Sequence, residues 1–344
     1  MRSFSWGRPA LSLFVAATGV LLLVSCGGGG SNGKVQIDSV ASFGDSLSDL
    51  GTYQVGPIAA AGGGRFTTNP AKIWVEYVAE AYGQSITRNR TSGFGTPVAV
   101  SGGTAYGQGG SRVTSQPGIG NTGQVSGVDA GASTLPITDQ VTAHLAAVGG
   151  VIPPTQLILV LGGDNDIFYQ AGVVSASGGT PAAVAAAQTA AGTAGAQLAA
   201  QVKRLVAAGA KNVVVLTAFD PAFSLATGGS ASTAALFNAL TLALNNGLTG
   251  GLVGVAGVTV VPSYDFIADV TTHPGKYGIT NVTTPACNIA VLPGNSSLFC
   301  SAATLVAPGA ENTYLFADAV HPSKGTHALF GAYVLDRIKS ALPR

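Results

Sequence analysis

The stretch Ala41-Ser42-Phe43-Gly44-Asp45-Ser46-Leu47-Ser48-Asp49 decides how the rest of this sequence is interpreted. It follows an apolar run that begins at Val35 and predicts a strand, and it ends in a short acidic segment before Gly51. A strand that stops at Gly-Asp-Ser and turns into a helix start would place Ser46 at the carboxyl edge of a sheet, where open α/β folds bind ligands. We therefore interpret Ser46 as a nucleophile, which needs a base, a group that orients the base, and donors for an oxyanion.

Composition and charge limit the classes of protein to be considered. The chain has 344 residues, of which 47% are hydrophobic and 9% charged, and its net charge is +1. This length suits one large domain or two small ones, with ample core to bury. The sequence has no basic stripe that could neutralise phosphates, so we expect no nucleic-acid partner.

The N-terminal segment 1–25 has the layout of a secretory signal. Two arginines precede the apolar run 11–24, which is too short and ends too abruptly for a membrane span. Cys26 directly follows Leu-Val-Ser, which resembles a bacterial lipobox, so we predict cleavage before Cys26 and acylation of its thiol. An ordinary signal peptide with an incidental cysteine is the alternative.

Residues 26–34 are then a lipidated cysteine and a Gly-rich tether, and 35–344 are the folded domain. Gly27 stands where a lipoprotein retained in the inner membrane would carry Asp. We therefore predict an exported outer-membrane lipoprotein of a Gram-negative bacterium, on the periplasmic or cell-surface side, with a secreted protein as the alternative. The lipid anchor would be its membrane contact, and we expect a monomer.

The two remaining cysteines are Cys287 and Cys300. An exported chain with an even cysteine count favours a disulfide between them, and a free reactive thiol is the alternative. No Cys-x-x-Cys pair and no His/Cys cluster indicates zinc, so we expect no metal.

Apolar β-branched runs alternate with helix-like stretches, which is typical of a parallel sheet covered on both faces. The predicted strands are Ile37–Phe43, Val98–Val100, Leu157–Leu161, Asn212–Thr217 and Val258–Val261. The predicted helices are Pro70–Ala81, Ile137–Val148, Ala182–Ala208, Ala234–Leu248 and Ser323–Leu342. The segments 102–135 and 273–313 lack periodicity and are rich in Gly, Ser, Thr and Asn, so we expect long loops that build a binding site.

A base for Ser46 has to come from the four histidines of the chain. His321 follows Asp318 by three residues, in a turn closed by proline, so the carboxylate can reach back to the imidazole and fix its tautomer. His144 falls in a helix-like stretch, at a surface or packing position, and His327 falls inside the last helix in a structural position. The loop residue His273 has no acidic residue arranged to orient it.

Oxyanion donors are expected from two further segments. The strand Leu157–Leu161 leads into Gly162-Gly163-Asp164-Asn165-Asp166, and the side-chain amide of Asn165 is a suitable donor. The second segment, Gly107-Gln108-Gly109-Gly110-Ser111, offers glycine N–H groups with no Cβ in the way, and the spacing alone does not identify the donor.

Four separated motifs resemble, in order and rough spacing, the four blocks of SGNH (GDSL-type) esterases and lipases. They are Phe43–Asp49, Gly109-Gly110, Gly163–Asp166 and Asp318–His321. The similarity extends over about Val40 to Leu342 and includes Gly64-Arg65-Phe66-Thr67, Trp74 and Cys287. It implies a flavodoxin-like, three-layer α/β/α fold with a five-stranded parallel sheet of order 2-1-3-4-5.

The resemblance also implies roles for individual residues. Ser46 would be the nucleophile, His321 the general base and acid, and Asp318 its orienting carboxylate. The oxyanion would be bound by the Ser46 N–H, the Gly109 N–H and the side chain of Asn165. The block around Gly109 departs from the usual opening of that block, which leaves Gly110 as the alternative donor.

The sequence thus predicts a carboxylic ester hydrolase that acts through an acyl-enzyme on acyl lipids or short-to-medium acyl esters, without a cofactor. A carbohydrate O-acetylesterase or an acyltransferase could use the same site. A lipid- or glycan-binding outer-membrane lipoprotein is the non-enzymatic alternative. A two-lobed solute-binding protein would show a second similar pattern, which the sequence lacks.

Overall fold

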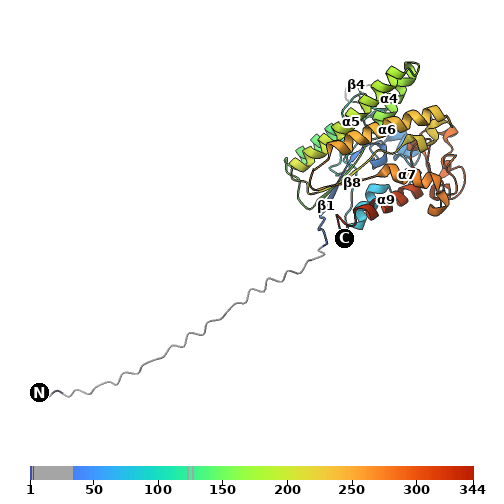
Figure 1. The fold of residues 1–344 in the computed structure, drawn as a ribbon. Coiled ribbons are helices and arrows are strands. Elements are labelled where there is room, and N and C mark those ends of the chain that lie inside the picture. The colour runs from blue at the N-terminus through green and yellow to red at the C-terminus, as the bar shows by residue number, and fades with distance from the viewer. Residues whose placement is uncertain (2, 4–33, 122–123, 126–127) are drawn as a thin grey trace. The chain divides into compact units, whose positions relative to one another are not determined.

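A parallel sheet of order β1-β6-β7-β8 forms the centre of the structure (Figure 1). This computed structural model describes residues 1, 3, 34–121, 124–125 and 128–344; Cys26 and nearly all of the predicted signal and tether lie outside the described residues. The strands of the sheet are β1 (Ser39–Gly44), β6 (Gln156–Leu161), β7 (Asn212–Leu216) and β8 (Val258–Val261).

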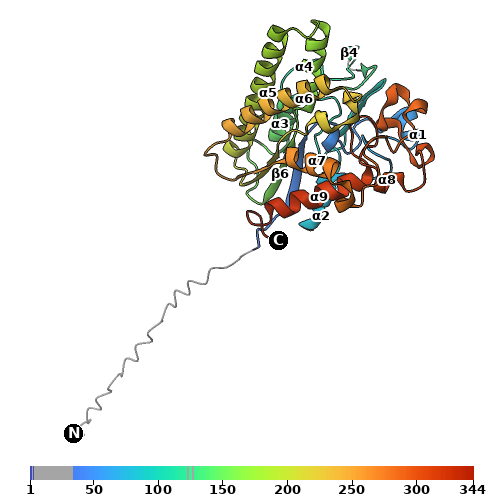
Figure 2. The same ribbon diagram turned by 45° about the vertical axis from the view of Figure 1, so that its right-hand side comes forward.

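Helices cover both faces of this sheet, because successive side chains of a strand point to opposite sides. On one face, Val40, Leu159 and Val214 pack with buried residues of α2 (Trp74–Ala81), α7 (Ser263–Thr272) and α9 (Lys324–Ile338). On the other face, Ala41, Ile158 and Val213 pack with the remaining long helices, which appear on the opposite side of the sheet in Figure 2. These are α3 (Ile137–Ala147), α4 (Asp164–Ala176), α5 (Pro181–Ala207) and α6 (Ala231–Gly251).

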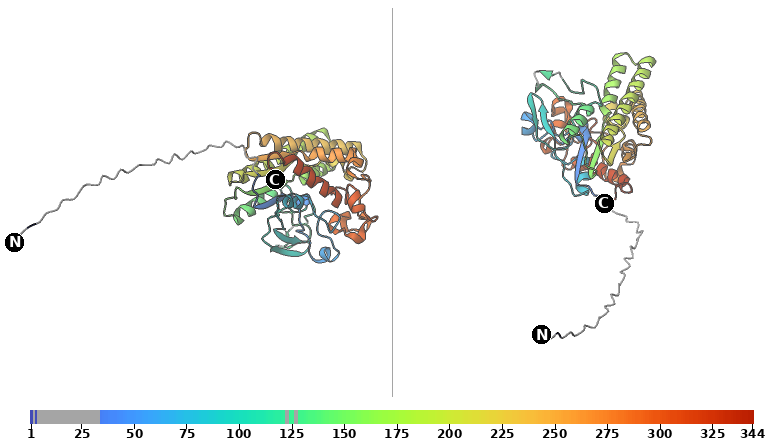
Figure 3. Two further views of the ribbon diagram at one scale, coloured as in Figure 1. Left: turned by 90° about the horizontal axis from the view of Figure 1, so that it is seen from below. Right: turned by 90° about the vertical axis from the view of Figure 1, so that its left-hand side faces the viewer.

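The three-layer α/β/α arrangement confirms the predicted fold class, and Figure 3 shows it from two further directions. Residues 34–344 form one compact unit. Within the described part of the chain, no helix is long and apolar enough to cross a membrane.

The prediction that Val98–Val100 belongs to the main parallel sheet is wrong. This segment lies in β3 (Thr96–Val100), which pairs antiparallel with β2 (Arg90–Gly93) in a separate hairpin. The place beside β1 is taken by a single parallel bridge between Ser42 and Ala105, so four strands rather than five form the main sheet among the described residues. The chain at Ala105 departs after one bridge because it turns into the glycine-rich segment that lines the site.

The helix predicted over Pro70–Ala81 starts later in the structure than expected. It begins at Trp74 instead, because the Glu76 carboxylate accepts the N–H of Ile73 at 2.9 Å and so completes the first turn four residues later. The helix α5 ends at Ala207, and Gly209 follows with φ +110°, a conformation that glycine adopts readily after a helix.

Short elements occupy the long segments that the sequence predicts as loops. The segment 102–135 contains the two-residue strands β4 (Gln124–Val125) and β5 (Val128–Asp129). The segment 273–313 contains several 3-10 turns and α8 (Ala310–Thr313). The five-residue helix α1 (Gly56–Ala60) lies between β1 and α2. The helices α4 and α7 were not predicted, because polar residues interrupt their apolar periodicity.

Candidate active site

Ser46 lies at the carboxyl end of β1, as predicted. The strand ends at Gly44, where a Cβ would lie 2.0 Å from the carbonyl oxygen of Leu161, so only glycine permits this approach to β6. Asp45 then caps a 3-10 turn over Ser46–Ser48 by accepting the N–H of Leu47 at 3.1 Å. This sharp turn holds Ser46, which is 9% exposed, on the wall of a cavity.

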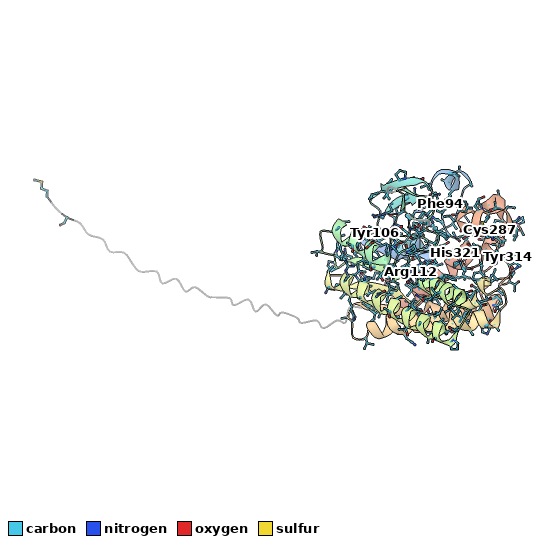
Figure 4. The ribbon with its side chains drawn as sticks, turned by 90° about the horizontal axis from the view of Figure 1, so that it is seen from above. Phe94, Tyr106, Arg112, Cys287, Tyr314 and His321 are labelled. Atoms are coloured by element: carbon cyan, nitrogen blue, oxygen red, sulfur yellow. A yellow bond between two sulfur atoms is a disulfide. The ribbon has the colours of Figure 1, made fainter. Side chains whose placement is uncertain are left out.

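His321 and Asp318 complete a chain of hydrogen-bonding groups with Ser46, although Ser46 and His321 are 275 positions apart in the sequence. The Nε2 of His321 lies 2.9 Å from Ser46 Oγ, and its Nδ1 lies 2.7 Å from Asp318 Oδ2. Figure 4 labels His321 among the side chains of the folded unit. The ring of Phe66 lies against the imidazole, with centroids 5.0 Å apart. The structure therefore brings together the serine, base and carboxylate that the sequence singled out.

The carboxylate of Asp318 is held by backbone N–H groups as well as by the imidazole. Its Oδ1 accepts from the N–H groups of Val320 and His321 at 2.9 and 2.8 Å, and its Oδ2 accepts from the N–H of Ser297 at 2.8 Å. Burial alone would raise the pKa of Asp318, but the imidazole and these N–H groups outweigh burial and lower the pKa well below its ordinary value. The group is therefore ionised and fixed in orientation.

The Gly109 N–H is not available to an oxyanion, which corrects its predicted role. It donates to Asp49 Oδ2 at 2.9 Å, and the carbonyl of the same residue accepts from the Tyr53 hydroxyl at 2.8 Å. Gly110 lines the cavity beside Ser46, with φ +82°, and its N–H has no partner in the part of the chain that the structure describes. Of the two glycines, Gly110 is therefore the one whose N–H is left without a partner beside Ser46.

Asn165 faces the same cavity from the first turn of α4. Its amide donates one N–H to the carbonyl of Ser111 at 3.0 Å, which leaves the second N–H for another acceptor. Asp166 fixes this arrangement, because its carboxylate accepts from Arg112 Nε at 2.9 Å and from the N–H of Val113 at 2.8 Å. The ion pair joins the start of α4 to the glycine-rich segment.

A cavity of about 680 Å³ opens beside Ser46 and has mainly apolar walls. The apolar side chains that line it include Phe66, Phe94, Phe168, Phe219, Ile267, Leu298, Phe299 and Phe316. A volume of this size and an apolar lining with a few polar groups are typical of small-molecule sites.

A disulfide joins Cys287 to Cys300, as predicted. The loop that it closes carries Ser297, whose N–H binds Asp318, and the cavity wall residue Leu298. The disulfide therefore supports both the carboxylate and the cavity wall.

The three other histidines lie away from this cavity. His144 is buried and lies 2.9 Å from Gln156 Oε1 in the core, and His327 is fully buried in α9. The expectation that His273 lacks an orienting acid is wrong, because its Nδ1 lies 2.9 Å from Asp269 Oδ1. That pair is exposed and has no serine bound to it within the described residues.

The sequence model of the family described as GDSL-like Lipase/Acylhydrolase matches residues 40–334 of this chain. The chain belongs to that family. A comparison with curated proteins finds no match. Membership of this GDSL family shows that the protein is an esterase- or lipase-type acylhydrolase. Among the described residues of this acylhydrolase, no group of three or more His, Cys, Asp or Glu side chains is placed to hold a metal ion.

Sequence reasoning missed several groups of the site. The N–H of Ser297 could not be found, because a backbone donor leaves no signal in residue types. Arg112 could have been proposed as the partner of a buried acid, since it directly follows the glycine-rich segment. The aromatic side chains of the cavity come from distant segments, and only the fold brings them together.

Proposed function

We propose that this acylhydrolase cleaves carboxylic esters through a covalent intermediate on Ser46. The observation that carries the proposal is the continuous chain from Ser46 Oγ through His321 to Asp318, at the wall of an apolar cavity. This arrangement provides a nucleophile, a base within hydrogen-bond reach, and a carboxylate that orients the base.

The proposed reaction has two proton transfers through one imidazole. His321 Nε2 takes the proton of Ser46 Oγ as this oxygen attacks the ester carbonyl, and Asp318 stabilises the imidazolium. The oxyanion binds to the N–H groups of Ser46 and Gly110 and to the amide of Asn165. His321 then protonates the leaving alcohol, and a water molecule repeats the sequence on the acyl-enzyme to release the acid.

The cavity favours esters with an extended apolar chain. Its walls are formed by aromatic and aliphatic side chains, and each buried CH₂ of a substrate contributes about 0.8 kcal/mol of binding. An acetyl group would leave most of the 680 Å³ unfilled. We therefore expect acyl esters of medium or greater length to be better substrates than acetyl esters.

A series of p-nitrophenyl esters from acetate to decanoate tests both parts of the proposal. We expect kcat/KM to rise with chain length, and the Ser46→Ala variant to lose hydrolysis of every ester. The exposed Ser101 provides a matched control, since Ser101→Ala should retain wild-type rates. A Ser46→Ala protein with wild-type rates would reject the mechanism, whereas activity confined to acetate would indicate an O-acetylesterase instead.

The same series of p-nitrophenyl esters distinguishes a hydrolase from a binding protein and from a transferase. A non-catalytic lipoprotein would not hydrolyse any of these esters, and an acyltransferase would accelerate product release when an acceptor alcohol is added.

We also propose that the protein is exported before it acts, and that the mature chain begins with an acylated Cys26. The Leu-Val-Ser-Cys motif supports this proposal. Mass spectrometry of the mature N-terminus tests this point. A diacylglyceryl-modified Cys26 is the expected result, and cleavage elsewhere without a lipid would indicate an ordinary secreted protein.

A further inference from the structure

The side chain of Gln140 lies at the point where β1 loses its neighbour on the outer edge of the sheet. Along this edge, the Ser42 N–H donates to the Thr104 carbonyl at 3.0 Å, and the Tyr106 N–H donates to the Ser42 carbonyl at 2.8 Å. The next N–H on the same edge belongs to Gly44, and it donates to Oε1 of Gln140 at 2.9 Å instead of to a backbone carbonyl. A side chain thus continues the hydrogen bonding of β1 where the glycine-rich segment turns away.

The partners of the Gln140 amide belong to three separate segments of the chain. Its Nε2 donates to the carbonyls of Gly44 and Leu135 at 2.8 and 2.9 Å. The same Leu135 carbonyl accepts from the Ser111 hydroxyl at 2.8 Å, and Nε2 lies 3.4 Å from that hydroxyl. Gln140 belongs to α3 and is 0% exposed, so bulk water does not compete for these bonds. One acceptor and two donors in a single planar group fit this set of partners.

The three proposed oxyanion donors lie next to this network. Gly44 is two residues before Ser46, and Ser111 directly follows Gly110. The carbonyl of Ser111 accepts from the side-chain amide of Asn165 at 3.0 Å. The buried amide therefore links the segments that carry all three donors.

Gln140 is not among the residues that line the cavity, so it can act on a bound ester only through these segments. Removal of its amide would leave the buried Gly44 N–H without its acceptor, and a buried unpaired donor is unfavourable enough to move the backbone that carries it. Oxyanion donors act only when they are held at hydrogen-bond distance from the developing charge. A shift at Gly44 would therefore be felt at the adjacent turn of Ser46.

We propose that Gln140 is a positioning residue for the oxyanion site. Its amide holds the turn that carries Ser46 in place relative to the glycine-rich segment and the start of α4, so that the three donors point to one oxygen atom. This inference deepens the proposed function and rests on it wherever activity is the readout. Loss of the amide should lower kcat more than it changes KM, because the oxyanion forms only in the transition state.

Two variants of Gln140, assayed with p-nitrophenyl decanoate, separate this role from packing. Gln140→Leu supplies no polar group, so we expect kcat to fall at least about tenfold while KM changes less than about threefold. Gln140→Glu keeps the shape, but its carboxyl group can donate to a carbonyl only while it is protonated, a form that burial favours. We therefore expect the ratio of its kcat to that of the wild type to fall at least about tenfold between about pH 5 and pH 8. The exposed Gln36 gives the matched control, since the ratio for Gln36→Glu should not change with pH.

A second measurement does not need ester hydrolysis. Amide hydrogen exchange, followed by NMR on the folded wild type and on folded Gln140→Leu, reports on the Gly44 N–H directly. We expect this N–H to exchange at least about tenfold faster in the variant, while the amides of the central strand β7 keep their wild-type protection.

The outcomes of these experiments are distinguishable. Unchanged protection of the Gly44 N–H in Gln140→Leu would overturn the link through the amide. A wild-type kcat in Gln140→Leu, or a pH-independent ratio in Gln140→Glu, would overturn the positioning role. A wild type that hydrolyses no ester, together with faster exchange at Gly44 in the variant, would overturn the proposed function and retain the link.

Discussion

Reduction of the Cys287–Cys300 disulfide should weaken both stability and catalysis. The two cysteines are 13 residues apart, and for a loop of this length the chain-entropy model gives about 3 kcal/mol of stabilisation. For a unit of the size of Lys34–Arg344, this corresponds to a fall in Tm of about 5 °C.

The catalytic part of this prediction follows from the loop that the disulfide closes. The Ser297 N–H stabilises the ionised Asp318, and Leu298 and Phe299 line the cavity. When this loop opens, Asp318 loses one of its three backbone donors and the cavity loses part of its wall. We therefore expect kcat to fall and KM for long-chain esters to rise in the reduced protein.

The assay compares Tm and p-nitrophenyl ester kinetics before and after treatment with a non-thiol reductant. The double variant Cys287→Ala/Cys300→Ala is the matched control, because reductant should leave its already lowered Tm and kcat unchanged. An unchanged Tm and kcat in a wild-type protein whose thiols are shown to be free would refute the role of this loop.

Further predictions concern single side chains of the site. Asp318→Asn should lower kcat by about 10³–10⁴-fold, because the amide cannot stabilise the imidazolium. A smaller loss of kcat in Asp318→Asn than in the control variant His273→Asn would contradict the role of Asp318. Asn165→Ala should lower kcat by about 10²–10³-fold with KM nearly unchanged, and an effect on KM alone would indicate substrate binding instead. Ala226→Phe should reduce kcat/KM for decanoate at least about tenfold more than for acetate, because Ala226 lines the cavity and a larger side chain there would displace CH₂ groups of a long acyl chain. Equal effects on both esters would contradict an acyl-binding site at Ala226. The pKa values of Asp45 and Asp164 are raised on folding, so between about pH 4 and 7 the folded state binds more protons than the unfolded chain and stability falls as the pH rises. Asp164→Asn should flatten this dependence of Tm on pH in thermal melts. Parallel Tm–pH slopes in the variant and the wild type would contradict the prediction.

The sign for Asp318 is opposite, because its pKa is lowered on folding. Its contribution to stability is complete above the ordinary pKa of an aspartate and is lost as the pH falls through its folded value. The acid limb of the stability curve should therefore be shallower in Asp318→Asn than in the wild type.

The sequence allowed the strands and the order of the site segments to be predicted because their residue patterns are local. The apolar run before Gly44 and the β-branched run 157–161 each predict a buried strand, and parallel strands place the residues after their carboxyl ends at one sheet edge. Asp318 and His321 could be paired because only two residues separate them.

Features that depend on pairing between distant segments could not be predicted. Val98–Val100 has a strand-like composition, but nothing in it shows that its partner is Arg90–Gly93 rather than β1. The choice between Gly109 and Gly110 depends on Asp49, which engages the first of these N–H groups at 2.9 Å.

The most direct test of the central claim is intact-protein mass spectrometry after treatment with a fluorophosphonate, which traps an activated serine. The account predicts a single adduct on Ser46 in the wild type and in His273→Asn, no adduct in Ser46→Ala, and greatly slowed labelling in His321→Asn. Labelling of Ser46→Ala at the wild-type rate, or ester hydrolysis by a wild-type protein that takes up no label, would contradict the proposed nucleophile.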